Sequence, residues 1–227
     1  MVATAFFATG CGNIFMPKHR VLVDAISSPS AVKPMGQSYR LVAKRSVVSQ
    51  ASAQVPVVKA CVDAALAGQG MFEPPPNVAP DLFIEISYGR NAPPMSDPAS
   101  RETYLQLSAR SNPLRALDRA SGEEVWDVKV TILGLGGAVD QAMPLLSSVA
   151  VGYIASDTRV ETKVEVPQKS PAVEAIRQNA MKALDAKSQG QAASAATPRS
   201  AAGAANGAPS PVAPAATANP PPPTATR

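Results

Sequence analysis

The segment Glu124–Leu133, EVWDVKVTIL, decides the fold. Apolar and polar residues alternate along it, with Trp126 and Val128 on one side and Asp127 and Lys129 on the other. Successive side chains of a β-strand point to opposite faces, so this period of two predicts a strand with one buried face. Sheets with one face in water are typically antiparallel. We therefore expect an antiparallel neighbourhood here and a core position for Trp126, the alternative being an exposed binding residue.

The sequence on either side of this segment supplies its partners. Alternating or apolar-rich stretches predict further strands at Arg20–Ile26, Tyr39–Lys44, Asp81–Tyr88, Thr103–Arg110 and Arg159–Val166. Helical spacing of apolar residues predicts three helices, which run from about 52–56 to Gly68 or Gly70, from about Pro144 to Ser156, and onward from Ser170-Pro171. The expected class is α+β, with a mixed, mainly antiparallel sheet and helices packed on one face.

Composition divides the chain into three parts. Residues 1–11 read as a partial signal and lipobox segment, and residues 12–187 as a single α+β domain. Residues 188–227 are rich in Ala, Pro, Ser, Thr and Gly, without an aromatic residue and with Val212 as the sole large aliphatic one. Such a segment buries too little apolar surface to offset the entropy lost on ordering, so we expect a disordered tail.

The charge of the chain is modest and dispersed. Lys and Arg number 21 against 17 Asp and Glu, which gives a net charge of +4. Basic and acidic residues alternate along residues 159–165, so no basic stripe indicates nucleic acid as a partner. Two short basic groups remain, Lys18–Arg20 and Arg40 with Lys44 and Arg45. They form either a solvated face or a contact with anionic head groups or polymer.

The beginning of the chain carries a candidate lipidation site. A short apolar run, Val2–Ala8, precedes Thr9-Gly10-Cys11. The segment Ala8-Thr9-Gly10-Cys11 resembles a bacterial lipobox, which implies acylation of Cys11 and of the new amino terminus. Those acyl chains exceed the two signals that stable anchoring needs. Because no Lys or Arg precedes the run, we expect the natural start of the chain to lie upstream.

Cys61 bears on the fate of Cys11, because it is the second of two cysteines. An exported protein permits a disulfide between them, and an unmodified free thiol at Cys11 is a further alternative. Val58, Cys61, Val62 and Ala65 follow helical spacing, which places Cys61 on the apolar stripe of a helix. We expect Cys61 to be a small, inert core residue, which favours lipidation of Cys11.

Other motifs predict no catalytic, cofactor or metal site. In the glycine-rich stretch 132–137 the final position of a G-x-G-x-x-G spacing falls on Val139, and Pro144 is expected to delay the helix, so we interpret it as a flexible turn and not a phosphate cradle. His19 is the single histidine, which excludes most zinc sites and histidine triads. The adjacent Glu123-Glu124 pair lies at a strand entrance and is expected to be solvated. We expect the chain not to be an enzyme.

The stretch from about Tyr39 to Asp157 resembles proteobacterial outer-membrane lipoprotein domains of unknown function. The features that carry the resemblance are Tyr39–Ala43, Ala67–Phe72, Ala79–Ile84, Tyr104–Ala109 and Asp118–Trp126. The resemblance implies an exported, non-enzymatic domain that is lipid-anchored on the periplasmic face of the outer membrane. It brings no known activity or binding residues.

Three hypotheses follow. The first is a membrane-tethered lipoprotein with a structural or envelope-assembly role, which holds an envelope protein or the cell wall near the membrane. The alternative is a soluble periplasmic ligand-binding module that takes a small molecule or glycan in a groove between sheet and helices. The third concerns the Pro-rich tail, which could dock into an aromatic-lined groove or reach through the peptidoglycan mesh.

Overall fold

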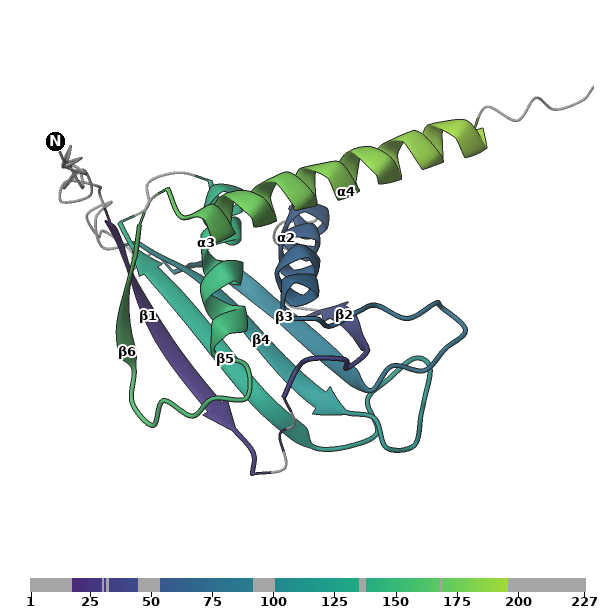
Figure 1. Ribbon diagram of the computed structural model, residues 1–227, viewed down its shortest axis with the longest axis horizontal. Coiled ribbons are helices and arrows are strands. Elements are labelled where there is room, and N and C mark those ends of the chain that lie inside the picture. The colour runs from purple at the N-terminus through teal and green to yellow at the C-terminus, as the bar shows by residue number, and fades with distance from the viewer. Residues whose placement is uncertain are drawn as a thin grey trace, which may run out of the picture.

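A computed structural model of the chain describes residues 18–29, 31, 33–44, 54–91, 101–134, 138–167 and 169–195. Within these ranges one sheet has the strand order β2-β3-β4-β5-β1-β6, and helices cover one of its faces (Figure 1). The strands are β1 (Lys18–Ser27), β2 (Tyr39–Ala43), β3 (Leu82–Asn91), β4 (Glu102–Ser111), β5 (Glu124–Leu133) and β6 (Thr162–Pro167). The helices are α2 (Val55–Gly68), α3 (Val139–Gly152) and α4 (Pro171–Ala195).

The sheet is mixed and mainly antiparallel, which confirms the predicted α+β class. Strands β3, β4 and β5 pair with their chain neighbours in antiparallel register, and β1 lies antiparallel between β5 and β6. Strand β2 alone runs parallel to its neighbour, β3, because the α2 crossover separates the two. A parallel pair needs such a crossover connection, whereas an antiparallel pair does not. The connection between β4 and β5, residues 112–123, is accordingly a loop without a helix.

Strand β5 has the bounds that its sequence pattern predicts. Trp126, Val128, Val130 and Ile132 are all buried on the face toward the helices, which we call the helix face. Trp126 is 2% exposed, so the prediction of a core position is confirmed. Asp127 and Lys129 point to the opposite side, the open face of the sheet. The period of two therefore correctly predicts which face of the sheet the helices cover.

Helices α2 and α3 lie between the sheet and α4 (Figure 1), and α3 buries the continuous run Ala142–Ser147. Helix α2 buries Val58, Cys61, Val62, Ala65 and Leu66, as its spacing predicts. Helix α4 lies across α2 and α3 (Figure 1) and buries Val173, Ile176 and Ala180, all from its first half. Cys61 is a buried free cysteine, and burial raises the pKa of its thiol to about 11. It is thus the inert core residue that we expected.

Helix α3 begins earlier than predicted. It starts at Val139, so the expectation that Pro144 delays the helix is wrong. Pro144 lies inside α3, where it cannot donate a hydrogen bond to the preceding turn. Ala142 and Met143 are 3% and 0% exposed, and burying these side chains offsets the missing hydrogen bond.

Two further boundaries differ from the sequence prediction. Strand β6 begins at Thr162 and not at Arg159, because Arg159 has a left-handed backbone with φ of 56°. Helix α4 runs to Ala195, so it continues past the boundary that the sequence places at Lys187. Alanine and glutamine in this stretch have high helix propensity and continue the helix past the core. The rest of the predicted tail lies outside the described residues.

Candidate functional site

The single predicted site residue, Cys11, lies outside the described residues, and its acylation stays a prediction. The described part of the chain begins at Lys18, the first residue of β1. No helix in the described ranges is long and apolar enough to cross a membrane.

The other residues considered from the sequence do not come together. His19 is half-buried on β1, next to the sheet edge formed by β6. Glu124 is exposed and accepts a 2.6 Å hydrogen bond from the Ser108 hydroxyl. Within the described ranges, no group of three or more His, Cys, Asp or Glu side chains could hold a metal ion. Gly134 has a φ of 74°, and the other glycines of the same stretch lie outside the described residues.

The structure instead forms a pocket on the open face, which we call the β2 groove. Its volume is about 500 Å³. Strands β2, β3 and β4 supply its floor, and the loop between β4 and β5 supplies a wall. The lining residues are Val42, Ala43, Lys44, Phe83, Glu85, Arg110, Asp118, Arg119 and Ala120.

Sheet register explains the groove's apolar floor. Val42 lies opposite Glu85 in the parallel β2–β3 pair, and Phe83 lies opposite Arg110 in the antiparallel β3–β4 pair. These side chains therefore share the open face. Phe83 is 5% exposed although it belongs to the face that carries no helix. Arg40 and Arg110 lie beside Phe83 on the two neighbouring strands, and the β4–β5 loop lines the same pocket.

The rim of the groove is rich in cations. Lys44, Arg110 and Arg119 form no salt bridge with any part of the chain that the structure describes. Two carboxylates, Glu85 and Asp118, also line the groove, so positive charges exceed negative ones by one. An apolar floor beside unpaired cations suits a ligand that carries both an apolar group and an anionic group.

The loop that walls the groove is fixed by Asn112, which is 3% exposed. Its amide nitrogen donates to the carbonyls of Pro80 (2.9 Å) and Ala116 (2.8 Å). Its amide oxygen accepts from the backbone N–H of Ala116 (3.0 Å) and from the hydroxyl of Ser121 (2.9 Å). One side chain thus uses all of its polar atoms to close the loop around itself.

Arg40 ties this loop to the proline-rich connection before β3. Its guanidinium donates to the carbonyl of Val78 at 3.1 Å and to the carbonyl of Leu117. Arg40 is therefore turned toward the backbone of the loop. Lys44, four residues further along the same face, lines the groove. The predicted basic group thus has two separate roles, and Arg45 lies outside the described residues.

Asp81 anchors the start of β3 in the same region. One carboxylate oxygen accepts from the Ser38 hydroxyl (2.6 Å) and the Ser38 N–H (2.9 Å), and the other from Arg115 (2.6 Å). Burial raises the pKa of Asp81, but the hydrogen bonds from Ser38 and the Arg115 guanidinium outweigh this effect and hold the pKa below its ordinary value. The loops around the groove are therefore held both by the charged hydrogen bonds of Asp81 and by the neutral hydrogen bonds of Asn112.

Sequence reasoning did not find this groove. The one signal it used was the basic group that includes Lys44, interpreted as a possible contact with an anionic polymer. Phe83, Arg110 and Arg119 are isolated in the sequence, and only the pairing of β2, β3 and β4 brings them together.

No family model and no curated protein matches the sequence. Solved structures with a similar arrangement include a PDZ domain protein from Parabacteroides distasonis, 9% identical over 67% of this chain, with a TM-score of 0.47. The chain spans 40% of that protein's length. Two PelC dodecamer structures from Paraburkholderia phytofirmans are 10% identical, with TM-scores of 0.39 and 0.40. The matches cover 61% and 60% of this chain. They cover 99% and 98% of the respective PelC chains. At these scores the similarities carry no argument about function.

Proposed function

We propose that this chain is a non-catalytic bacterial lipoprotein, anchored through acylated Cys11 on the periplasmic face of the outer membrane. Its domain holds a partner of the cell envelope, a protein or the cell wall, in the β2 groove. The observation that carries the proposal is the groove itself. Lys44, Arg110 and Arg119, which form no salt bridge within the described residues, line it together with the buried ring of Phe83. The lipobox-like segment that ends in Cys11 supports the anchor.

The position of the groove fits such a tether. In the sheet register, Lys18 lies at the end where Glu102 pairs with Leu133, whereas Arg110 pairs with Glu124 at the opposite end. A strand rises about 3.4 Å per residue, so roughly 30 Å separate the first residue of β1 from the groove. The seven-residue step from Cys11 to Lys18 spans at most about 25 Å. An anchor at Cys11 would therefore attach the domain by the end of the sheet opposite to the groove.

The anchor is tested by replacing Cys11 with serine in the full-length natural chain. We expect the parent protein to sediment with membranes and to show a mass increment of acyl chains at its mature amino terminus. The C11S variant should lack the increment and appear in the soluble fraction. Cys61→Ser is the matched control, because Cys61 is buried and its loss should leave the anchor intact. Unchanged membrane attachment of the C11S variant would contradict the anchor at Cys11. A parent protein that lacks acyl chains and appears in the soluble fraction would favour the soluble ligand-binding alternative.

The groove is tested with anilinonaphthalene sulfonate, an aromatic anion whose fluorescence rises in apolar surroundings. We expect it to bind the folded domain, and we expect Arg110→Glu to weaken binding about tenfold, because a cation at the rim becomes an anion. Lys163→Glu is the matched control, since Lys163 is an exposed cation on β6, at the other edge of the sheet. Equal effects of the two charge reversals would show that net charge alone binds the dye and would remove the groove from the proposal.

A further inference from the structure

Strand β2 is an edge strand, and the backbone N–H and C=O groups of alternate residues point toward β3 or away from the sheet. The N–H of Lys44 donates to Ile86 at 3.0 Å, and the N–H of Leu82 donates to the carbonyl of Ser38 at 3.1 Å, so even-numbered residues face β3. The N–H of Tyr39 instead donates to the carbonyl of Phe72 at 2.9 Å, on the other side. Because the pattern alternates along a strand, the N–H and C=O groups of odd-numbered residues point away from the sheet.

Beyond the contact with Phe72, this outer edge has no partner strand in the part of the chain that the structure describes. Phe72 makes a single parallel bridge with Ser38 before the chain turns away into Pro74–Pro76. Leu41 and Ala43 thus present outward backbone groups that pair with no described strand. A row of such groups is a template for another extended segment.

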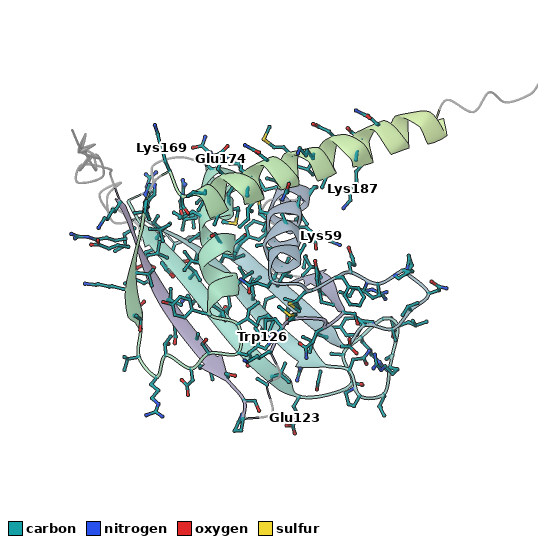
Figure 2. The ribbon with its side chains drawn as sticks, viewed as in Figure 1. Lys59, Glu123, Trp126, Lys169, Glu174 and Lys187 are labelled. Carbon is teal, nitrogen blue, oxygen red and sulfur yellow. The ribbon has the colours of Figure 1, made fainter. Side chains whose placement is uncertain are left out.

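A second pocket borders the same edge on the helix face, and we call it the α4 pocket. Its volume is about 640 Å³, and Tyr39 of β2 lines it together with residues of α2, α4 and the segment after α2. The second half of α4 projects beyond α2 on this side (Figure 1), and Lys59 and Lys187 both lie beside the resulting overhang (Figure 2). The pocket's apolar lining is formed by Ala60, Ala64, Ala67, Met71, Phe72 and Ala183.

The two pockets and the edge between them define one binding mode. Side chains of an extended strand point alternately to the two faces of a sheet. A strand added beside Leu41–Ala43 therefore sends alternate side chains to the β2 groove and to the α4 pocket, while its backbone pairs with β2. We propose that β2 takes up an extended segment of a partner protein in which acidic and apolar residues alternate. This inference rests on the proposed function of the groove and names the kind of partner.

The charges on the two faces set the pattern of the segment. On the open face, Lys44, Arg110 and Arg119 have no ion-pair partner among the described residues, so acidic side chains belong there. On the helix face the carboxylates already have partners: Asp63 accepts from the Tyr39 hydroxyl at 3.2 Å, and Glu73 pairs with Lys59 at 3.3 Å. What remains on that face is mainly alanine, methionine and phenylalanine surface, which suits apolar side chains.

A second copy of this chain fits the edge poorly in the register centred on Val42. Antiparallel pairing of two β2 strands about Val42 would set Arg40 of one copy opposite Lys44 of the other, twice. Like charges directly opposite one another destabilise a strand pair. The acidic segment of a different protein has no such conflict.

The probe for the test is a capped hexapeptide in which valine and glutamate alternate, titrated into the domain. We expect binding to slow hydrogen exchange at the amides of Leu41 and Ala43. The corresponding valine–lysine hexapeptide should bind at least tenfold more weakly. Two N-methylated peptides complete the test, one methylated at the odd-numbered amides and one at the even-numbered amides. One set should abolish binding and the other should change the affinity by no more than about twofold, because only one set of amides faces β2.

Ala43→Pro tests the edge from the side of the protein. The N–H that this substitution removes points outward, so the pairing with β3 is kept. We expect at least a tenfold loss of hexapeptide affinity, with Ala43→Val, which keeps the N–H, as the matched control. If the parent domain did not bind the dye anilinonaphthalene sulfonate, the proposed function of the groove would fail. Dye binding without hexapeptide binding at ~1 mM, or equal binding by the two N-methylated sets, would overturn strand addition alone.

Discussion

Trp126→Ala is expected to lower the free energy of unfolding by about 3–5 kcal/mol, the range for removing a large aromatic side chain from a core. The indole is 2% exposed and lies on the helix face of β5, opposite Ala109 of β4 and Ser27 of β1. These small neighbours cannot expand to fill the space that the indole leaves. The side chain also borders a third pocket, of about 330 Å³, so the cavity left by alanine would merge with existing open space.

The measurement is urea unfolding followed by far-ultraviolet circular dichroism, because Trp126 is the only tryptophan and its fluorescence is lost with the substitution. Leu114→Ala is the matched control, since Leu114 is 79% exposed on the β4–β5 loop and should change stability by less than about 0.5 kcal/mol. A loss below about 1 kcal/mol for W126A would mean that Trp126 is not the core residue that its burial indicates.

The core of this fold could be predicted from sequence because it depends on local periodicity. The alternation in EVWDVKVTIL gives the bounds of β5 and the burial of Trp126, and helical spacing gives the buried position of Cys61. The start of α3 could not be predicted in this way, since Pro144 is a local signal against a helix that tertiary burial of Met143 overrides. Local rules report the period of an element more reliably than its ends.

The groove could not be predicted because none of its properties is local. Phe83 belongs to the face of β3 that alternation assigns to solvent, and it is buried between Arg40 and Arg110 of the neighbouring strands, in a pocket that the β4–β5 loop also lines. Arg110 reaches Phe83 through antiparallel register, and Val42 reaches Glu85 through a parallel pairing that the sequence does not specify. The outward edge of β2 also depends on which strand ends the sheet. The order and pairing of the strands decide these contacts. Both depend on residues far apart in the sequence, so no short segment of the sequence predicts them.

Asn112→Ala is expected to lower the free energy of unfolding by about 2–4 kcal/mol. The substitution removes four hydrogen bonds of a side chain that is 3% exposed. It also leaves the Pro80 carbonyl and both backbone groups of Ala116 without these partners. Each buried polar group left unsatisfied costs roughly 1–3 kcal/mol, and entry of water into the loop recovers part of that sum. Asn77→Ala, at an exposed position in the connection before β3, should cost less than about 0.5 kcal/mol.

The same substitution separates loop order from groove chemistry. Asn112 does not line the β2 groove, but it fixes the loop that carries Asp118–Ala120, which form the groove's wall. We therefore expect the N112A variant, measured below its unfolding transition, to bind anilinonaphthalene sulfonate about tenfold more weakly, although every cation of the rim is still present. Chemical shifts of the β1–β6 edge, far from this loop, should stay as in the parent domain. Parent-like dye affinity in a destabilised N112A variant would mean that the sheet floor alone holds the anion, with the arginine of the wall, Arg119, making no contribution.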